Sequence, residues 1–165
     1  MASLELPFDR GTTWDSGSAG AVPDNLIGSV YRLKDGTTLR ICKNVDAAAL
    51  SGGRLVRINS SQGSCLVNEA SGAPDLRQLG ISDYAYKSAA VTIPVNALFY
   101  VAQAGNHRCL FGNSVAAGQP TVGHATDGTL GSGTIISGQA VGYVGVTLAA
   151  VNSGVYGWIR MIPVI

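Results

Sequence analysis

Residues 121–165 read TVGHATDGTLGSGTIISGQAVGYVGVTLAAVNSGVYGWIRMIPVI, and this stretch indicates the fold more clearly than any other part of the chain. Short runs of valine, isoleucine and threonine are interrupted by glycines every few residues. β-Branched side chains suit a pleated sheet, and glycine suits the sharp turns between strands. The charged side chains here are Asp127 and Arg160. The stretch therefore predicts tight β structure that offers few groups for acid–base chemistry.

The rest of the chain continues this pattern of short strands and turns. Asp35-Gly36 lies between two apolar runs and favours a hairpin, and residues 54–59 and 65–70 favour a second one. Further strands are expected at 89–93, 97–103, 107–111, 134–137, 139–148 and 155–162, with turns at Pro94 and at Gly105-Asn106. Short helices are expected at 44–50 and 74–79. We predict an all-β fold, a β-sandwich or barrel of short strands with one or two short helices.

The N-terminal residues differ from the rest of the chain in their sequence pattern. A chain of 165 residues suits one domain with an arm, and we predict an extended arm over 1–27 and a single β domain over 28–165. The arm lacks periodicity, yet it carries large apolar side chains that a solvated tail rarely has. These side chains are Leu4, Leu6, Phe8 and Trp14. We expect them to anchor the arm on its own domain or on a neighbour, which we take to be an adjacent subunit or a capsid shell.

The composition argues against two classes of partner. Charged residues make up 13% of the chain, against about 25% in average proteins, and the net charge is +1. The basic residues are scattered, so we expect no nucleic-acid binding. No apolar stretch approaches the roughly 20 residues that span a membrane, and the N-terminus lacks the pattern of a signal peptide. We therefore expect no membrane partner and synthesis in a cytosol, where the three cysteines remain buried thiols.

No motif in the sequence predicts a catalytic residue, a cofactor or a metal. The glycine cluster at 128–133 lacks the lysine of a phosphate-binding loop. Residues 112–116 lack the second glycine of a nucleophile elbow. His107 and Cys109 fall short of the four ligands of a zinc site, although His107 and His124 can be assembled into a hydrolase triad on paper. We expect a protein that is not an enzyme.

Two aromatic residues near the C-terminus are candidates for a contact between subunits. Residues 84–104 and 134–165 are almost free of charge, and large exposed apolar surfaces usually mark contacts. Tyr156 and Trp158 are our candidates for the buried edge of a homo-oligomer, because aromatic residues are enriched at interface cores. Both side chains are also compatible with the core of the domain, and Trp158 with a glycan platform.

The C-terminal half resembles the small β domains of phage capsid decoration proteins, also called cement proteins. The resemblance rests on AAGQPTVGHATDGTLGSGT at 116–134 and AVGYVGVTLAAVNSGVYGWIRMI at 140–162. The second stretch has the ending of such proteins, an alanine-rich turn, a glycine, an aromatic residue and then Val/Ile-Arg. Residues 28–112 do not align with this family.

This resemblance implies a virion protein on the capsid exterior, synthesised in the host cytoplasm. It implies binding to the major capsid protein, often through an N-terminal arm, and subunits that are trimeric or otherwise clustered. Our first hypothesis is therefore a non-enzymatic protein that decorates and stabilises a capsid. The alternative is a receptor- or glycan-binding head-fibre or tail-fibre module, and another assembly subunit of a tail or neck stays open.

Overall fold

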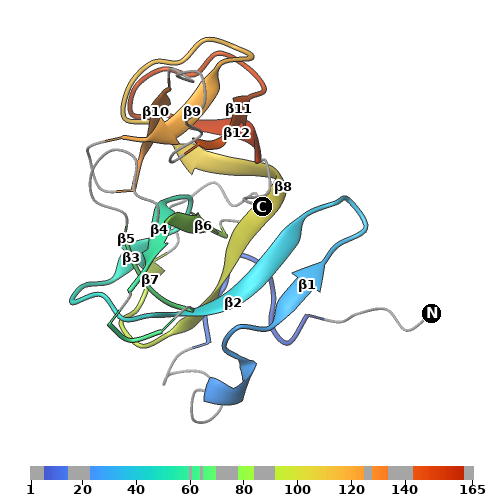
Figure 1. Ribbon diagram of the computed structural model, residues 1–165, viewed down its shortest axis with the longest axis vertical. Coiled ribbons are helices and arrows are strands. Elements are labelled where there is room, and N and C mark those ends of the chain that lie inside the picture. The colour runs from blue at the N-terminus through green and yellow to red at the C-terminus, as the bar shows by residue number, and fades with distance from the viewer. Residues whose placement is uncertain are drawn as a thin grey trace.

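The computed structural model describes residues 6–14, 23–59, 61–63, 65–69, 78–83, 92–124, 128–133 and 143–161. Its strands are β1 Val30–Arg32, β2 Thr38–Asn44, β3 Leu50–Ser51, β4 Leu55–Ile58, β5 Leu66–Glu69, β6 Gln78–Ser82, β7 Thr92–Ile93, β8 Leu98–Leu110, β9 Pro120–Gly123, β10 Leu130–Ser132, β11 Tyr143–Thr147 and β12 Tyr156–Met161. A 3-10 turn, η1, spans Asp24–Leu26. The prediction of an all-β fold is confirmed (Figure 1).

Strand pairing links two parts of the molecule through β8. The pairing order is β1-β2-β5-β4-β6-β8-β12-β11-β9-β10, and β2 also pairs with β8. The strands β2, β5, β4, β6 and β8 therefore close into a ring, which has the topology of a small barrel. All its pairings are antiparallel except that of β2 with β5. Beyond the ring, β8 continues into a second sheet with β12, β11, β9 and β10 (Figure 1).

The long strand β8 changes partners half-way along its length. Its first half pairs with β2 as far as Ala104, and its second half pairs with β12 from Gly105 onward. Gly105 has φ +94°, a conformation that favours glycine, and it lies against the backbone of Thr37. The predicted turn at Gly105-Asn106 is therefore wrong. The glycine bends a continuous strand that is shared by two sheets.

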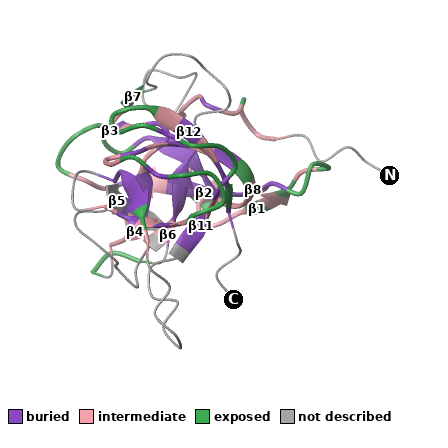
Figure 2. Ribbon diagram, turned by 90° about the horizontal axis from the view of Figure 1, so that it is seen from above, coloured by how far each residue is buried: buried purple, intermediate pink, exposed green. Residues whose placement is uncertain are grey.

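Two hydrophobic clusters stabilise this arrangement, and Figure 2 shows buried residues along the central strands. One cluster fills the inside of the ring and includes Cys42, Val56, Val67, Phe99 and Val101. The other lies on the opposite face of β2 and β8, continues into the second sheet, and includes Leu39, Ile41, Tyr100, Ala102, Phe111, Leu130 and Ile159. Side chains alternate between the two faces of a strand, so β2 and β8 contribute to both clusters.

Both expected hairpins are confirmed, because β1 pairs with β2 and β4 pairs with β5 in antiparallel register. The turn at Pro94 is also confirmed by the hydrogen bond from the Ala97 N–H to the Pro94 carbonyl oxygen, 3.2 Å. The expected strand at 134–137 lies outside the described residues. The described residues include no helix that is long and apolar enough to cross a membrane.

The expected helix at 44–50 is wrong. Asn44 ends β2 instead of capping a helix, and its side chain is completely buried. The Asn44 amide donates to the carbonyl oxygens of Ala48 and Ile93, at 3.2 and 3.1 Å, and its oxygen accepts from the Asp46 N–H. An asparagine that bonds nearby backbone groups competes with helix formation. For the other expected helix, residues 74–77 lie outside the described part, and Gln78 begins β6.

Candidate functional site

The N-terminal segment, residues 6–14, folds back onto the β domain. The Trp14 N–H donates to the Leu98 carbonyl oxygen at 2.9 Å, and the Leu98 N–H donates to the Trp14 carbonyl oxygen at 2.8 Å. Leu6, Phe8 and Trp14 are partly buried against the core cluster shared by the two sheets. The structure therefore places three of the four predicted arm residues on their own domain, while Leu4 lies outside the described residues. Binding of these residues to a capsid stays a prediction.

Aromatic contacts fix the segment over the first half of β8. The ring of Phe8 stacks on that of Tyr100, with centroids 4.3 Å apart, and meets Trp14 edge-on at 6.2 Å. The Tyr100 hydroxyl donates to the Phe8 carbonyl oxygen at 3.0 Å. Burial raises the pKa of Tyr100 to about 12, so the hydroxyl stays protonated and remains a donor near neutral pH. Stacked and edge-on aromatic pairs add about 0.5–1.5 kcal/mol beyond the area they bury.

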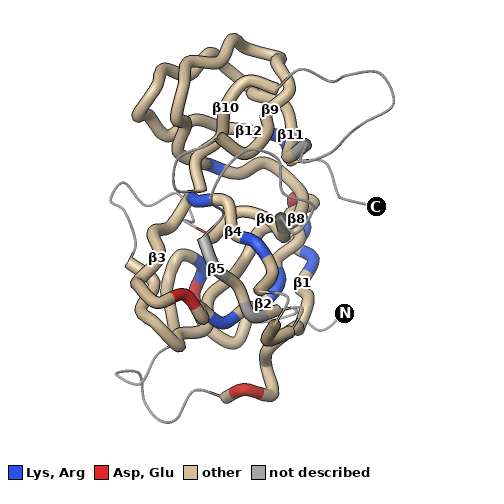
Figure 3. Tube along the Cα trace, turned by 60° about the vertical axis from the view of Figure 1, so that its left-hand side comes forward, with Lys and Arg blue, Asp and Glu red and all other residues tan. Residues whose placement is uncertain are grey.

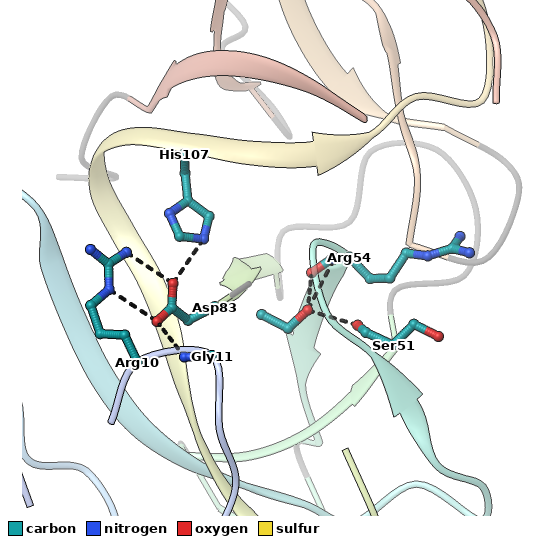
Figure 4. A network of polar contacts seen from close by, with 7 residues as sticks. Arg10, Gly11, Ser51, Arg54, Asp83 and His107 are labelled. Atoms are coloured by element: carbon teal, nitrogen blue, oxygen red, sulfur yellow. Dashed lines mark hydrogen bonds and ion pairs between the residues drawn. The ribbon is translucent and has the colours of Figure 1, made fainter. Parts of the chain in front are cut away.

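A buried ion pair fixes the same segment next to these rings (Figure 4). Arg10 donates from Nε and Nη2 to the two carboxylate oxygens of Asp83, at 3.1 and 2.9 Å, and the Gly11 N–H donates to Oδ2 at 3.3 Å. The Asp83 side chain is 1% exposed, and that of Arg10 is 16% exposed. A two-pronged arginine–carboxylate pair is both strong and geometrically specific. We call Arg10, Asp83 and His107 the buried polar cluster.

His107 completes the buried polar cluster from β8. Its Nε2 lies 3.3 Å from Asp83 Oδ1, which is within ion-pair distance, but the described residues give Nε2 no hydrogen bond. Burial lowers the pKa of His107 to about 4, although the Asp83 carboxylate opposes this shift. The imidazole is therefore neutral at physiological pH, and the Arg10 guanidinium is the cation that balances Asp83.

Hydrogen bonds also fix the backbone at Ser82 and Asp83. The Ser82 hydroxyl accepts from the Arg54 N–H at 3.0 Å and donates to the Ser51 carbonyl oxygen at 2.9 Å (Figure 4). The Asp83 N–H donates to the Tyr100 carbonyl oxygen at 2.7 Å. These bonds tie the end of β6 to the β3–β4 turn and to β8. The carboxylate of Asp83 is therefore presented to Arg10 from a backbone with little freedom to move.

The structure brings Tyr156 and Trp158 to one face of β12, the face that also carries Arg160 and points away from the core. The Tyr156 hydroxyl donates to the Gly52 carbonyl oxygen at 3.1 Å, and the Arg108 guanidinium lies 5.9 Å from the Tyr156 ring centroid. Trp158 is half-buried and lies opposite Arg108 across the strand pair. The described contacts of Tyr156 are therefore within the chain, and a subunit contact at either residue stays a prediction.

Sequence reasoning missed the buried polar cluster. Arg10 and Asp83 are 73 positions apart in the chain, and no spacing or motif connects them with His107. The one available signal was a set of isolated charged residues in a chain with few charges. The other histidine, His124, lies beside Gly112 and Gly131 in the second sheet, away from Asp83. The structure therefore does not bring the two histidines together into a hydrolase triad.

The structure contains no group of three or more potential metal ligands within the residues it describes. Cys42, Cys65 and Cys109 are buried and form no disulfide, as expected from the sequence. No protein-family model matches the chain, and no curated protein matches it significantly.

Proposed function

We propose that the protein is a non-enzymatic virion component that decorates and stabilises a phage capsid by binding the major capsid protein. One observation carries the proposal. The side chains best equipped for chemistry, the buried polar cluster, lie inside the protein and fasten its N-terminal segment to the β domain. A substrate has no access to a carboxylate that is 1% exposed and already paired with an arginine. The cluster suits a mechanical role better than a catalytic one.

The architecture supports the same role. A protein that cements a capsid resists internal pressure through contact area and multivalent binding, and it needs a domain that does not deform. Here β8 belongs to both sheets, and the N-terminal segment is attached to it by backbone bonds at Trp14 and by the Phe8–Tyr100 stack. Load applied to the N-terminal segment would therefore pass directly into the central strand.

We place the contact with other subunits on the outward face of β11 and β12. Leu148, which directly follows β11, and Val155, which directly precedes β12, are 43% and 49% exposed. The Leu148 N–H donates to the Trp158 carbonyl oxygen at 2.9 Å, so an exposed leucine lies beside the half-buried tryptophan. Identical subunits arranged around an axis bury such a surface by symmetry. The number three comes from the resemblance to decoration proteins.

Replacing Trp158 with alanine should weaken self-association at least about tenfold, because truncating an aromatic anchor in an interface core typically costs about 2 kcal/mol. Sedimentation equilibrium of the purified protein measures this effect. Tyr156→Phe is the matched control, since it removes the hydroxyl bonded to Gly52 and leaves the outward face apolar. A monomeric wild-type protein at micromolar concentration, or equal association of both variants, would contradict the assignment.

The capsid role itself is tested by co-sedimentation with capsids assembled from major capsid protein that lack this chain. We expect saturable binding at a fixed ratio to capsid subunits, and greater resistance of the particles to heating once the protein is bound. Binding that never saturates, or particles whose stability is unchanged at saturation, would argue against a decoration protein.

A receptor- or glycan-binding fibre module is the second candidate. The observation in its favour is the pairing of Trp158 with Arg108 on an accessible sheet face, because aromatic rings flanked by polar donors can bind sugars. Selective binding to a glycan array, abolished in Trp158→Ala while capsid binding is absent, would favour this candidate.

A further inference from the structure

A pocket of about 520 Å³ lies at one end of the strand ring, beside the β1–β2 hairpin. Its lining includes Arg32, Thr38, Arg40, Leu79, Gln103 and Ala104. Figure 3 shows basic residues gathered around β1, β2 and β4. No residue of the buried polar cluster or of the outward face of β12 lines the pocket, so neither the proposed function nor the N-terminal segment accounts for it.

The hairpin register places two arginines on the same side of the sheet. Arg32 lies directly opposite Thr38, and Arg40 follows Thr38 by two residues on the same strand. Opposite residues of an antiparallel pair share a face, and so do residues two apart on one strand. Arg32 and Arg40 are therefore diagonal neighbours, within reach of a single small anion. Two like charges held this close repel one another unless an anion lies between them.

Arg40 is oriented by neutral partners. Its Nε donates to Gln103 Oε1 at 3.1 Å, its Nη1 lies 3.6 Å from the Cys65 sulfur, and the Gln103 amide donates in turn to the Leu79 carbonyl oxygen at 3.4 Å. Arg40 is also half-buried, and none of its described contacts is with a carboxylate. The guanidinium is thus held in one orientation, with Nη2 left over for a ligand.

The nearest acidic residue along the hairpin does not fill this role. Asp35 lies in the turn, where its Oδ1 accepts from the Thr37 N–H at 2.9 Å, and this bond lowers the pKa of its carboxyl group. Asp35 is not part of the pocket lining. Its charge stabilises the turn. Among the described residues, the two arginines therefore have no anionic partner.

We propose that this pocket binds the anionic group of a small organic ligand, a carboxylate or a phosphate, between Arg32 and Arg40. Guanidinium groups match the oxygen atoms of both anions, and a partly buried cation gains most from such a partner. Leu79 and Ala104 supply an apolar wall for the body of the ligand. The volume of about 520 Å³ is in the range of small-molecule sites, and it is more than a bare inorganic anion requires.

Isothermal titration calorimetry at constant ionic strength tests the proposal with three probes: phenyl phosphate, hexanoate and inorganic phosphate. We expect phenyl phosphate to bind more tightly than inorganic phosphate, and hexanoate to compete for the same site. Arg40→Gln should weaken binding of phenyl phosphate about tenfold or more, as the loss of a charge-assisted hydrogen bond predicts. Arg32→Gln should weaken it less, because Arg32 is more exposed.

Lys34→Gln is the matched control, because it removes one positive charge from an exposed residue of the β1–β2 turn that does not line the pocket. It should leave the affinity unchanged. Equal losses in Lys34→Gln and Arg40→Gln, or no saturable binding of any probe, would overturn the site. Inorganic phosphate binding as tightly as phenyl phosphate would overturn the assignment to an organic ligand. If Arg40→Gln fails to fold, the affinity of Arg32→Gln for phenyl phosphate tests the site instead, because Arg32 is exposed. Unchanged affinity in that variant would overturn the proposal.

Discussion

Asp83→Asn is expected to lower the free energy of unfolding by about 3 kcal/mol, because breaking a buried ion pair leaves the other charge without compensation. The stranded charge is that of Arg10, which bonds both carboxylate oxygens of Asp83. Asparagine keeps the size of the side chain, so the change tests the charge and not the packing. Urea denaturation followed by tryptophan fluorescence, near neutral pH, gives the free energy directly.

The control is Asp24→Asn, which removes the same charge from an exposed pair. Asp24 lies 3.0 Å from the Lys43 ammonium, and its side chain is 68% exposed. Solvent weakens such pairs, so we expect a loss of at most about 1 kcal/mol. Asp83→Asn should also speed hydrogen exchange at the Gly11 N–H, which donates to the carboxylate. Similar losses in both variants would contradict the clamping role of Asp83.

Lowering the pH from near 7 to near 5 is expected to destabilise the protein through His107 by about 2 kcal/mol. The pKa of His107 is about 4 in the folded chain, against 6.5 for an unperturbed histidine. Between these values the unfolded chain binds a proton that the folded chain does not, so stability falls as the pH falls from about 6.5 toward about 4. Burial beside Arg10 is what keeps the folded imidazole neutral, despite the nearby Asp83 carboxylate.

Denaturation of the variant His107→Gln at both pH values isolates this effect. The variant should lose most of the pH dependence across this window, because glutamine does not titrate. The wild-type protein, denatured at the same two pH values, is the control. An unchanged pH dependence in His107→Gln would show that His107 does not titrate between the two states.

The hairpins could be predicted because their signals are local. Asp35-Gly36 supplies a turn between two apolar runs, and β1 and β2 pair around it. The β-branched runs and glycines of the C-terminal stretch likewise predicted β structure, and the strands β9 to β12 lie in this part of the chain. Each of these features depends on residues that are close together in the sequence, so no knowledge of distant partners was needed.

Features that depend on distant partners could not be predicted. From its local sequence, Asn44 is equally suited to cap a helix or to end a strand. In the structure its side chain donates to the carbonyl oxygen of Ile93, which is distant in the sequence, and Asn44 ends a strand. Gly105 is typical of a turn. The part of β8 before it pairs with β2, however, and the part from Gly105 onward pairs with β12, so β8 continues through this position. The buried polar cluster and the pocket beside the β1–β2 hairpin both join residues from separate strands.

The position of the N-terminal segment was predicted in part. The large apolar side chains of this segment indicated that it is ordered, and their own domain was one of two places expected for them. The structure shows Phe8 and Trp14 in contact with the core of that domain. The sequence alone could not reveal this, because Tyr100, on which Phe8 stacks, is 92 residues away.

We propose that the protein occupies the exterior of a phage capsid. Electron microscopy of gradient-purified virions, labelled with an antibody raised against the folded protein, tests it most directly. We expect label distributed over the whole head at regular intervals, and loss of that label when the protein is released from the particles. Label confined to a tail, neck or fibre, or particles without label while the protein remains in the soluble fraction, would contradict it.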